Sequence, residues 1–154
     1  IRRAKPGIDF WVTGAAGGVA AADLAPGIPW TLTGHLPDVR PAVAESAVCV
    51  VPLRVGGGTR LKILQAMALG TPVVTTSKGA EGLAVTPGQD ILVGDTPDQF
   101  ASHVVHLLSD PALRERIARA ARARVGDGCT WSHSAARLED VLRESVSEWK
   151  AAQA

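Results

Sequence analysis

Residues 51–62 read VPLRVGGGTRLK: the end of an apolar strand, three consecutive glycines and the start of a helix. Consecutive glycines can adopt positive φ angles and let backbone N–H groups approach an anion closely. The N-terminus of a helix carries partial positive charge and unpaired N–H donors, which suit a diphosphate. Basic residues in the first turns oppose the helix dipole unless an anion compensates them. The stretch therefore predicts a diphosphate site formed by Gly56, Gly57, Gly58, Thr59, Arg60 and Lys62.

The glycine-rich segments suggest three other interpretations. The first is a glycine-rich turn whose cations are solvated and bind no ligand. A Walker-type phosphate loop is excluded, because Gly58 is followed by Thr59 and Arg60 instead of lysine and a hydroxyl residue. A second run, VTGAAGGVA at 12–20, resembles the cofactor loop of short-chain dehydrogenases. That family relies on a catalytic tyrosine, and this chain has no tyrosine. An NAD(P)-binding domain therefore stays an alternative only.

Short apolar runs alternate with helical patterns along the chain, which is typical of a parallel α/β sheet. The run at 47–53 is apolar on both faces, so we expect it to be central in the sheet. Open sheets of this kind bind ligands at the carboxyl ends of their strands, where the glycines lie. We expect one domain over 1–154, a Rossmann-like three-layer sandwich with a mainly parallel sheet. The predicted strands cover 8–13, 30–33, 47–53, 72–76 and 90–93, and the predicted helices cover 37–45, 59–69, 97–108, 111–125 and 131–149.

The composition is that of a globular protein, with 46% hydrophobic and 20% charged residues. Sixteen basic and fifteen acidic residues nearly cancel, so a nucleic-acid partner is not expected. Cys49 lies in an apolar run, where a buried free thiol fits a reducing compartment. No apolar stretch approaches the roughly 18 residues that a bilayer-spanning helix needs. These features predict a cytoplasmic protein.

The motifs together resemble a known enzyme family. From Gly34 to about Leu138 the sequence is similar to family-4-type glycosyltransferases of the GT-B architecture, the glycosyl transferases group 1. The resemblance rests on GHLPDVR at 34–40, VPLRVGGGTRLKILQAMALGTPVVTTSKGAEGL at 51–83, DILV at 90–93, DPALR at 110–114, and Trp131. It implies that the chain is the C-terminal, nucleotide-sugar-binding half of a two-domain enzyme.

The resemblance also implies roles for further residues. In that family two glutamates, eight residues apart, flank the start of the helix, and here their positions hold Gly57 and Gln65. Gln65 can still accept one ribose hydrogen bond, but it lacks charge assistance, which weakens such a contact by about 1 kcal/mol. Backbone groups of His35 and Leu36 are expected to contact the base. Gly79 and Glu81 are expected to border the sugar.

The activity that the resemblance implies is sugar transfer from a UDP- or GDP-linked donor to an unknown acceptor, with retention of configuration. No metal or other cofactor is expected, because the helix dipole and basic side chains stabilise the leaving diphosphate. Catalytic residues stay unassigned, because the acceptor-binding groups belong to an N-terminal half outside this chain. The alternatives are a nucleotide-sugar epimerase and a degenerate, non-catalytic binding module, the latter suggested by Gln65.

The start of the chain carries a further expectation. In the family, the first strand of this half lies in the middle of the sheet, and residues 1–6 read as the end of the helix that follows it. Strands 8–13 and 47–53 would then flank an unfilled position with unpaired backbone groups. We therefore expect the functional protein to be longer at its N-terminus, and the 154-residue chain alone to be inactive.

Two charged patterns are interpreted as exposed helix faces. His103 and His106 lie one helical turn apart but have no acidic or cysteine partner at ligand spacing, so no metal site is predicted. The second pattern is a run of arginines, for which the alternative is peripheral membrane contact of the full-length protein. This run comprises Arg114, Arg116, Arg119, Arg122 and Arg124.

Overall fold

This computed structural model describes residues 1–15, 30–128 and 130–153 of the chain. Residues 16–20 of the dehydrogenase-like loop, the segment 21–29 and Cys129 lie outside the described residues. The elements, in chain order, are β1 (Phe10–Val12), β2 (Trp30–Leu32), α1 (Arg40–Ala44), β3 (Cys49–Val51), α2 (Leu61–Leu69), β4 (Val73–Thr75), α3 (Ser77–Ala80), β5 (Leu92–Val93), α4 (Pro97–Ser109), α5 (Pro111–Gly128) and α6 (Trp131–Ala151).

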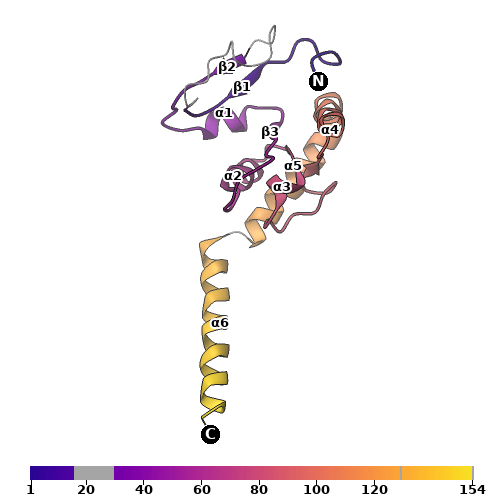
Figure 1. Ribbon diagram of the computed structural model, residues 1–154. Helices are drawn as coiled ribbons and strands as arrows, with labels where there is room; N and C mark the ends of the chain where they lie inside the picture. Colours follow the sequence, from indigo (N-terminus) through magenta and orange to yellow (C-terminus); the bar gives the residue numbers. More distant parts are fainter. Residues whose placement is uncertain (16–29, 129, 154) are drawn as a thin grey trace.

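The strands form two sheets, and β1 and β2 lie together, apart from β3, in Figure 1. Every pairing between two strands is parallel, and an isolated antiparallel bridge joins Gly14 to Gly34. One sheet pairs β1 with β2, with Phe10 opposite Trp30. The other has the order β3-β4-β5, with Cys49 opposite Val73. Consecutive parallel strands need crossover helices, and the chain supplies them between β3, β4 and β5. The predicted α/β class with a mainly parallel arrangement is confirmed.

The predicted central position of β3 is wrong for the described residues. β3 lies at the edge of its sheet, and the exposed fraction of Val50 is 40%. β1 and β3 belong to different sheets, so neither strand pairs with the other in the described part of the chain. The apolar residues on both faces of 47–53 predict burial on both faces, which the structure does not show for β3. The strand that is buried on both faces is instead β4, where Val73 and Val74 are both inaccessible.

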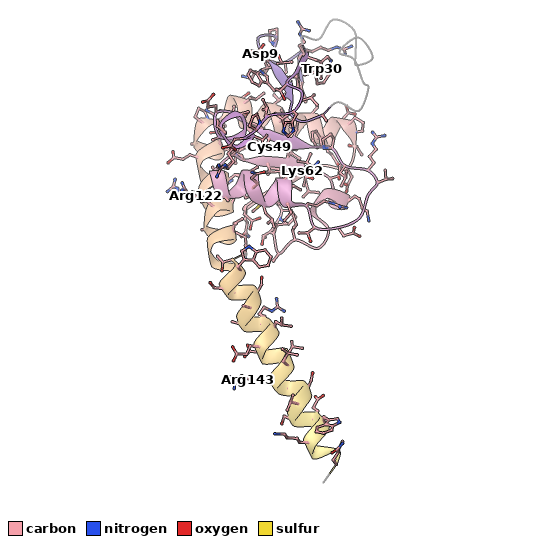
Figure 2. All side chains as sticks on the ribbon, turned by 90° about the vertical axis from the view of Figure 1, so that its left-hand side faces the viewer. Asp9, Trp30, Cys49, Lys62, Arg122 and Arg143 are labelled. Atoms are coloured by element: carbon pink, nitrogen blue, oxygen red, sulfur yellow. The ribbon has the colours of Figure 1, made fainter. Side chains whose placement is uncertain are left out.

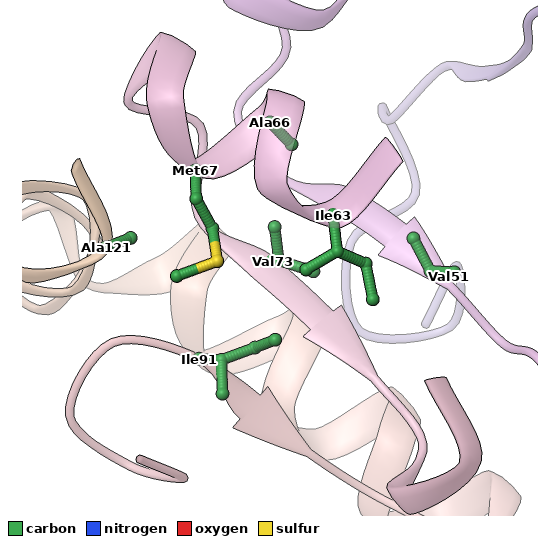
Figure 3. Packing of buried hydrophobic residues seen from close by; sticks show 7 residues of the cluster. All are labelled: Val51, Ile63, Ala66, Met67, Val73, Ile91 and Ala121. Carbon is green, nitrogen blue, oxygen red and sulfur yellow. The ribbon is translucent and has the colours of Figure 1, made fainter. Parts of the chain in front are cut away.

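The core lies on both faces of the three-stranded sheet, which makes the three layers. On one face α2 contributes Ile63 and Met67 and packs against Val73 (Figure 3). On the other face α4 contributes Val104 and Leu107, which pack with Val74 and Leu92. α5 takes part in both clusters, through Ala121 and Ile117. The arrangement is a Rossmann-like sandwich, and Ile63, in the first turn of α2, packs in the same cluster as Val51 at the end of β3.

Most helix ends follow the signals in the sequence. α2 ends at Gly70, whose φ of 79° is the left-handed conformation that suits glycine. α4 begins with a capping box between Thr96 and Gln99. α3 was not predicted. Within the described residues, every helix is too short or too polar to cross a membrane.

Candidate functional site

The glycine loop leaves β3 at its carboxyl end and leads into α2. Gly56 and Gly58 have φ angles of 132° and 78°, in the region that disfavours residues with a side chain. The hydroxyl of Thr75 donates to the carbonyl of Val51 at 2.9 Å, and Thr76 donates to the carbonyl of Leu53. Thr75 is the last residue of β4, and Thr76 directly follows it. The end of β4 therefore holds the first residues of the loop in place.

The side chain of Arg60 packs against the backbone of the glycine loop that precedes it. Its Nη1 donates to the carbonyls of Gly57 and Gly58, the latter at 2.7 Å, and its Nη2 donates to the carbonyl of Gly56 at 2.9 Å. Only 7% of the residue is exposed, and its Nε is buried without a hydrogen-bond partner. No carboxylate forms an ion pair with it among the described residues. Arg60 thus fixes the loop by its carbonyls, and the loop's backbone conformation follows from these three contacts.

The same arrangement leaves the loop's donors open. The N–H groups of residues 56–60 donate to no acceptor within the described part of the chain, and residues 56–59 are exposed. α2 has no side-chain cap and no acidic residue in its first turn. Lys62, in that turn, is exposed. A row of free donors, a helix N-terminus and an ammonium group together suit an anion with several oxygens.

Glu81 lies at the C-terminal end of α3. Its carboxylate accepts a hydrogen bond from Lys78 in an ion pair of 2.5 Å. The pKa of Glu81 is lowered by that hydrogen bond first, then by the charge of Lys78, with a further contribution from Arg60. No hydrogen bond or ion pair among the described residues joins Glu81 to the glycine loop. Thr76, which caps the start of α3, donates to the carbonyl of Leu53, so it is the start of α3 that the structure ties to the base of the loop.

Gly79 has a structural reason for lacking a side chain. A Cβ at this position would lie 2.0 Å from Oγ1 of Thr75. Its N–H already donates to the hydroxyl of Thr76 at 3.0 Å, as part of the cap of α3. Gly79 thus allows α3 to pack onto the end of β4, next to the loop, and its N–H is not free for a ligand.

The remaining predicted site residues, Gln65, His35 and Leu36, make no hydrogen bond or ion pair with the glycine loop within the described part of the chain. Gln65 is half-buried on α2, and its amide makes no hydrogen bond within the described residues. His35 is exposed and Leu36 half-buried, both after β2. Neither is joined to the glycine loop by a hydrogen bond or ion pair among the described residues. The free amide of Gln65 leaves that group available to a ligand.

Sequence reasoning missed a carboxylate at the same edge of the sheet. Asp95, two residues after β5, accepts hydrogen bonds from the N–H and the hydroxyl of Ser77, at 2.7 and 2.6 Å. These bonds lower the pKa of Asp95. The pair ties the residues after β4 to those after β5. The sequence signal was the position of Ser77 directly after one predicted strand and of Asp95 two residues after the next, but the two partners lie 18 residues apart.

Other features do not form a site. Among the described residues, no three histidine, cysteine, aspartate or glutamate side chains gather as metal ligands would. Nε2 of His103 lies 3.1 Å from the carbonyl of Val93, which accounts for that side chain. A hollow of about 550 Å³ runs along α6 and contains none of the predicted site residues. All of its walls come from one helix, so it does not enclose a ligand.

The comparisons with known proteins agree on one family. The sequence model described as Glycosyl transferases group 1 matches residues 1–110. The D-inositol 3-phosphate glycosyltransferase of Arthrobacter sp. (strain FB24) is 34% identical, over 97% of this chain and 38% of its own length. The GDP-mannose-dependent monoacylated alpha-(1-6)-phosphatidylinositol monomannoside mannosyltransferase of Corynebacterium glutamicum is 28% identical, over 69% of this chain and 30% of its own. The chain thus spans well under half of these relatives.

Solved structures show the same fold. The C-terminal domain of a glycosyl transferase group 1 family protein from Francisella tularensis superposes with a TM-score of 0.60 at 22% identity. That match covers 68% of this chain and 54% of the other. Sucrose-phosphate synthase from Thermosynechococcus elongatus gives a TM-score of 0.61 at 24% identity, over 77% of this chain and 31% of its own. These likenesses confirm the Rossmann-like C-terminal half of a GT-B fold. With its family match and its 34% identical relative, the chain belongs to the glycosyl transferases group 1.

Proposed function

We propose that this chain binds the diphosphate of a nucleoside diphosphate sugar and forms the donor side of a glycosyltransferase. The proposal rests on the conformation of the glycine loop, whose carbonyls accept hydrogen bonds from Arg60. Three carbonyls are held by the guanidinium, while the N–H groups of residues 56–60 have no acceptor in the described part. An anion that accepts from these donors would also offset the charges of Arg60 and Lys62.

The same groups suit the chemistry of sugar transfer. When the bond between the sugar and the diphosphate breaks, negative charge grows on the leaving diphosphate. Preorganised N–H donors and nearby cations lower the energy of that state more than that of the bound donor. The proposal therefore assigns the glycine loop and Lys62 to leaving-group stabilisation, without a metal ion and with retention of configuration at the sugar.

The base of the donor is left to experiment. The name of the Corynebacterium relative specifies GDP-mannose, whereas a 36% identical relative from Clavibacter sepedonicus is named for UDP-N-acetylglucosamine. The proposal includes either base. It also includes an acceptor-binding domain in a longer protein, so we expect no sugar transfer by the 154-residue chain.

A second candidate function is binding without catalysis. Gln65 supports it, because the resemblance implies a carboxylate at this position and the amide has no charge to assist a ribose hydrogen bond. The two candidates share the same diphosphate site. They differ in whether a longer protein that contains this domain transfers sugar.

Isothermal titration calorimetry of the chain with UDP, GDP, NAD and inorganic diphosphate tests the proposal. We expect UDP or GDP to bind more tightly than inorganic diphosphate, because the base and ribose add contacts. Lys62→Ala should weaken binding of UDP, GDP and inorganic diphosphate. Lys150→Ala, a matched change at the far end of α6, should leave these affinities unchanged. Preferential binding of NAD, or no binding of either nucleoside diphosphate, would overturn the proposal.

A further inference from the structure

The carboxyl ends of β3, β4 and β5 are joined to one another by side-chain hydrogen bonds. After β5, the carboxylate of Asp95 accepts from the N–H of Ser77 at 2.7 Å and from its hydroxyl at 2.6 Å. After β3, the carbonyl of Leu53 accepts from the hydroxyl of Thr76. Thr76 and Ser77 are neighbours in the chain after β4, so the two sets of bonds meet in one dipeptide. A continuous path of contacts therefore runs from Asp95 to Leu53.

Leu53 lies at the base of the glycine loop. It precedes Gly56 by three residues, and its side-chain methyls are the nearest atoms that a Cβ on Gly56 would meet, at 3.9 and 4.0 Å. Figure 2 labels Cys49 of β3 and Lys62 of α2, the two elements that the loop joins. Arg60 holds the carbonyls of residues 56–58, further along the loop. The loop thus has two supports, and the one at its base comes from the residue after β4.

We propose that Asp95 is a positioning residue of the diphosphate site. Its carboxylate fixes the backbone of Ser77, so that the hydroxyl of Thr76 stays on the carbonyl of Leu53 at the base of the glycine loop. This role rests on the proposed function of the loop and adds to it a residue from another strand. The ends of β3 and β5 are two strand spacings apart, which is about 10 Å. Asp95 therefore acts on the loop through the residues between them and does not touch a diphosphate bound there.

A carboxylate suits this position because Ser77 presents two donors. One oxygen of Asp95 accepts from the N–H and the other accepts from the hydroxyl. The amide of an asparagine has a single acceptor oxygen, and its hydrogen bonds carry no charge assistance. Asp95 is itself held in place, since its N–H and that of Thr96 both donate to the side chain of Gln99, at 3.3 Å. The start of α4 thus fixes the carboxylate, and the carboxylate fixes the residues after β4.

The negative charge of Asp95 acts on a bound diphosphate in the opposite direction. A carboxylate at the same edge of the sheet repels the anion, so removal of the charge alone should tighten binding or, with screening by salt, leave it unchanged. Loss of the positioning contacts should weaken binding, because a less ordered loop has to be fixed when the ligand binds. The sign of the change in affinity therefore separates the two effects of this side chain.

The conformation of the free loop tests the positioning role without any ligand. In two-dimensional 1H–15N NMR spectra of the labelled chain, Asp95→Asn should shift the amide signals of residues 56–58. Thr76→Val removes the hydroxyl that holds Leu53 and should shift the same signals. Asp98→Asn removes an equal charge from an exposed side chain in the first turn of α4, so it should leave these signals in place. Unshifted glycine signals in Asp95→Asn would overturn the proposal.

Calorimetric titration with inorganic diphosphate, UDP and GDP tests the consequence for binding. Asp95→Asn should weaken binding by roughly three- to tenfold, the effect of losing one hydrogen bond. Asp90→Asn is the control for lost stability, because Asp90 lies before β5, at the other end of the strand, and its buried carboxylate accepts from Arg124 at 3.0 Å. It should destabilise the fold and leave the affinity of the folded chain unchanged. Unchanged or tighter binding in Asp95→Asn would overturn the proposal, even if the glycine signals shift.

Failure of this role is distinguishable from failure of the proposed function. A wild-type chain that binds none of the three diphosphates would contradict the diphosphate site, and the glycine signals of the free chain would then decide whether Asp95 positions the loop. In a chain that binds, the double variant of Asp95→Asn and Thr76→Val should bind about as weakly as the weaker single variant, because both changes break one path. Fully additive losses would show that Asp95 does not act through Thr76 and would overturn the proposal.

Discussion

Nη2 of Arg60 lies 2.9 Å from the carbonyl oxygen of Gly56, four residues earlier in the chain. This contact closes the turn formed by residues 56–60, immediately before α2 begins. It also explains why α2 starts at Leu61 and not at the predicted Thr59, since Arg60 has a ψ of 63°, outside the helical range. In this structure the guanidinium of Arg60, a predicted residue of the diphosphate site, supports the carbonyls of the glycine loop.

Arg60→Ala should weaken diphosphate binding by about 1–3 kcal/mol, the range for leaving buried hydrogen-bonding groups without a partner. Without the guanidinium, the three carbonyls lose their donors and the loop loses its conformation. Calorimetric titration with UDP and GDP measures the loss. Arg60→Lys should recover only part of it, because an ammonium group cannot fill the same fork of donors. Arg54→Ala, which removes an exposed arginine of the same loop, is the control.

Unchanged affinity in Arg60→Ala would mean that diphosphate binding does not depend on the loop conformation that Arg60 supports. The unfolding transition should be measured alongside, since Arg60 is buried. A variant that binds normally but unfolds more easily would make Arg60 a purely structural residue.

Lys62→Ala should also weaken diphosphate binding, but with a different signature. Lys62 is exposed, so its attraction for the anion is screened by salt. The affinity difference between wild type and variant should shrink as the salt concentration rises. For Arg60→Ala the difference should persist, because buried contacts are screened less. A Lys62→Ala difference that does not change with salt would contradict this assignment.

Gln65→Glu should tighten binding of UDP or GDP by about 1 kcal/mol, because a carboxylate accepts charge-assisted hydrogen bonds from the ribose hydroxyls. Binding of inorganic diphosphate, which has no ribose, should stay the same or weaken slightly by charge repulsion. The comparison of the two ligands is therefore the control. Equal or weaker binding of the nucleotide would show that the ribose is held elsewhere.

Much of this arrangement could be predicted from the sequence, because strands, helices and their ends depend on local patterns. The apolar runs predicted β3 and β4, and Gly70 predicted the end of α2. The direction of the Arg60 side chain could not be predicted, because its partners exist only once Gly56 and Gly58 adopt positive φ angles. The position of β3 at the edge of its sheet could not be predicted either. An apolar run indicates a buried strand, but it does not indicate which strands pair with it on each side.

The bond between Asp95 and Ser77 predicts a pH dependence of stability. The pKa of Asp95 is lower in the folded chain because Ser77 donates to the charged form. The group therefore stabilises the fold above its unfolded pKa of about 3.9, and this contribution is lost as the pH falls through the lower, folded pKa. In Asp95→Asn the free energy of unfolding should therefore fall less steeply than in the wild type as the pH drops below about 4. Asp98→Asn, an exposed neighbour, is the control, and equal effects of both changes would contradict the assignment.

Gly79→Ala should destabilise the fold by about 1–3 kcal/mol, as expected for overpacking. The new Cβ would lie 2.0 Å from Oγ1 of Thr75, which cannot turn away freely because it donates to the carbonyl of Val51. In a Thr75→Ala background that oxygen is gone, and the remaining neighbours lie at 3.4 Å or more, so the same glycine substitution should cost little. Denaturant unfolding of the four variants gives the coupling between the two positions. Gly126→Ala, in an open stretch of α5 with no atom within 4 Å of the added methyl, should not destabilise the chain. If Gly79→Ala costs the same with and without the threonine hydroxyl, then the packing of α3 against β4 is not what requires a glycine there.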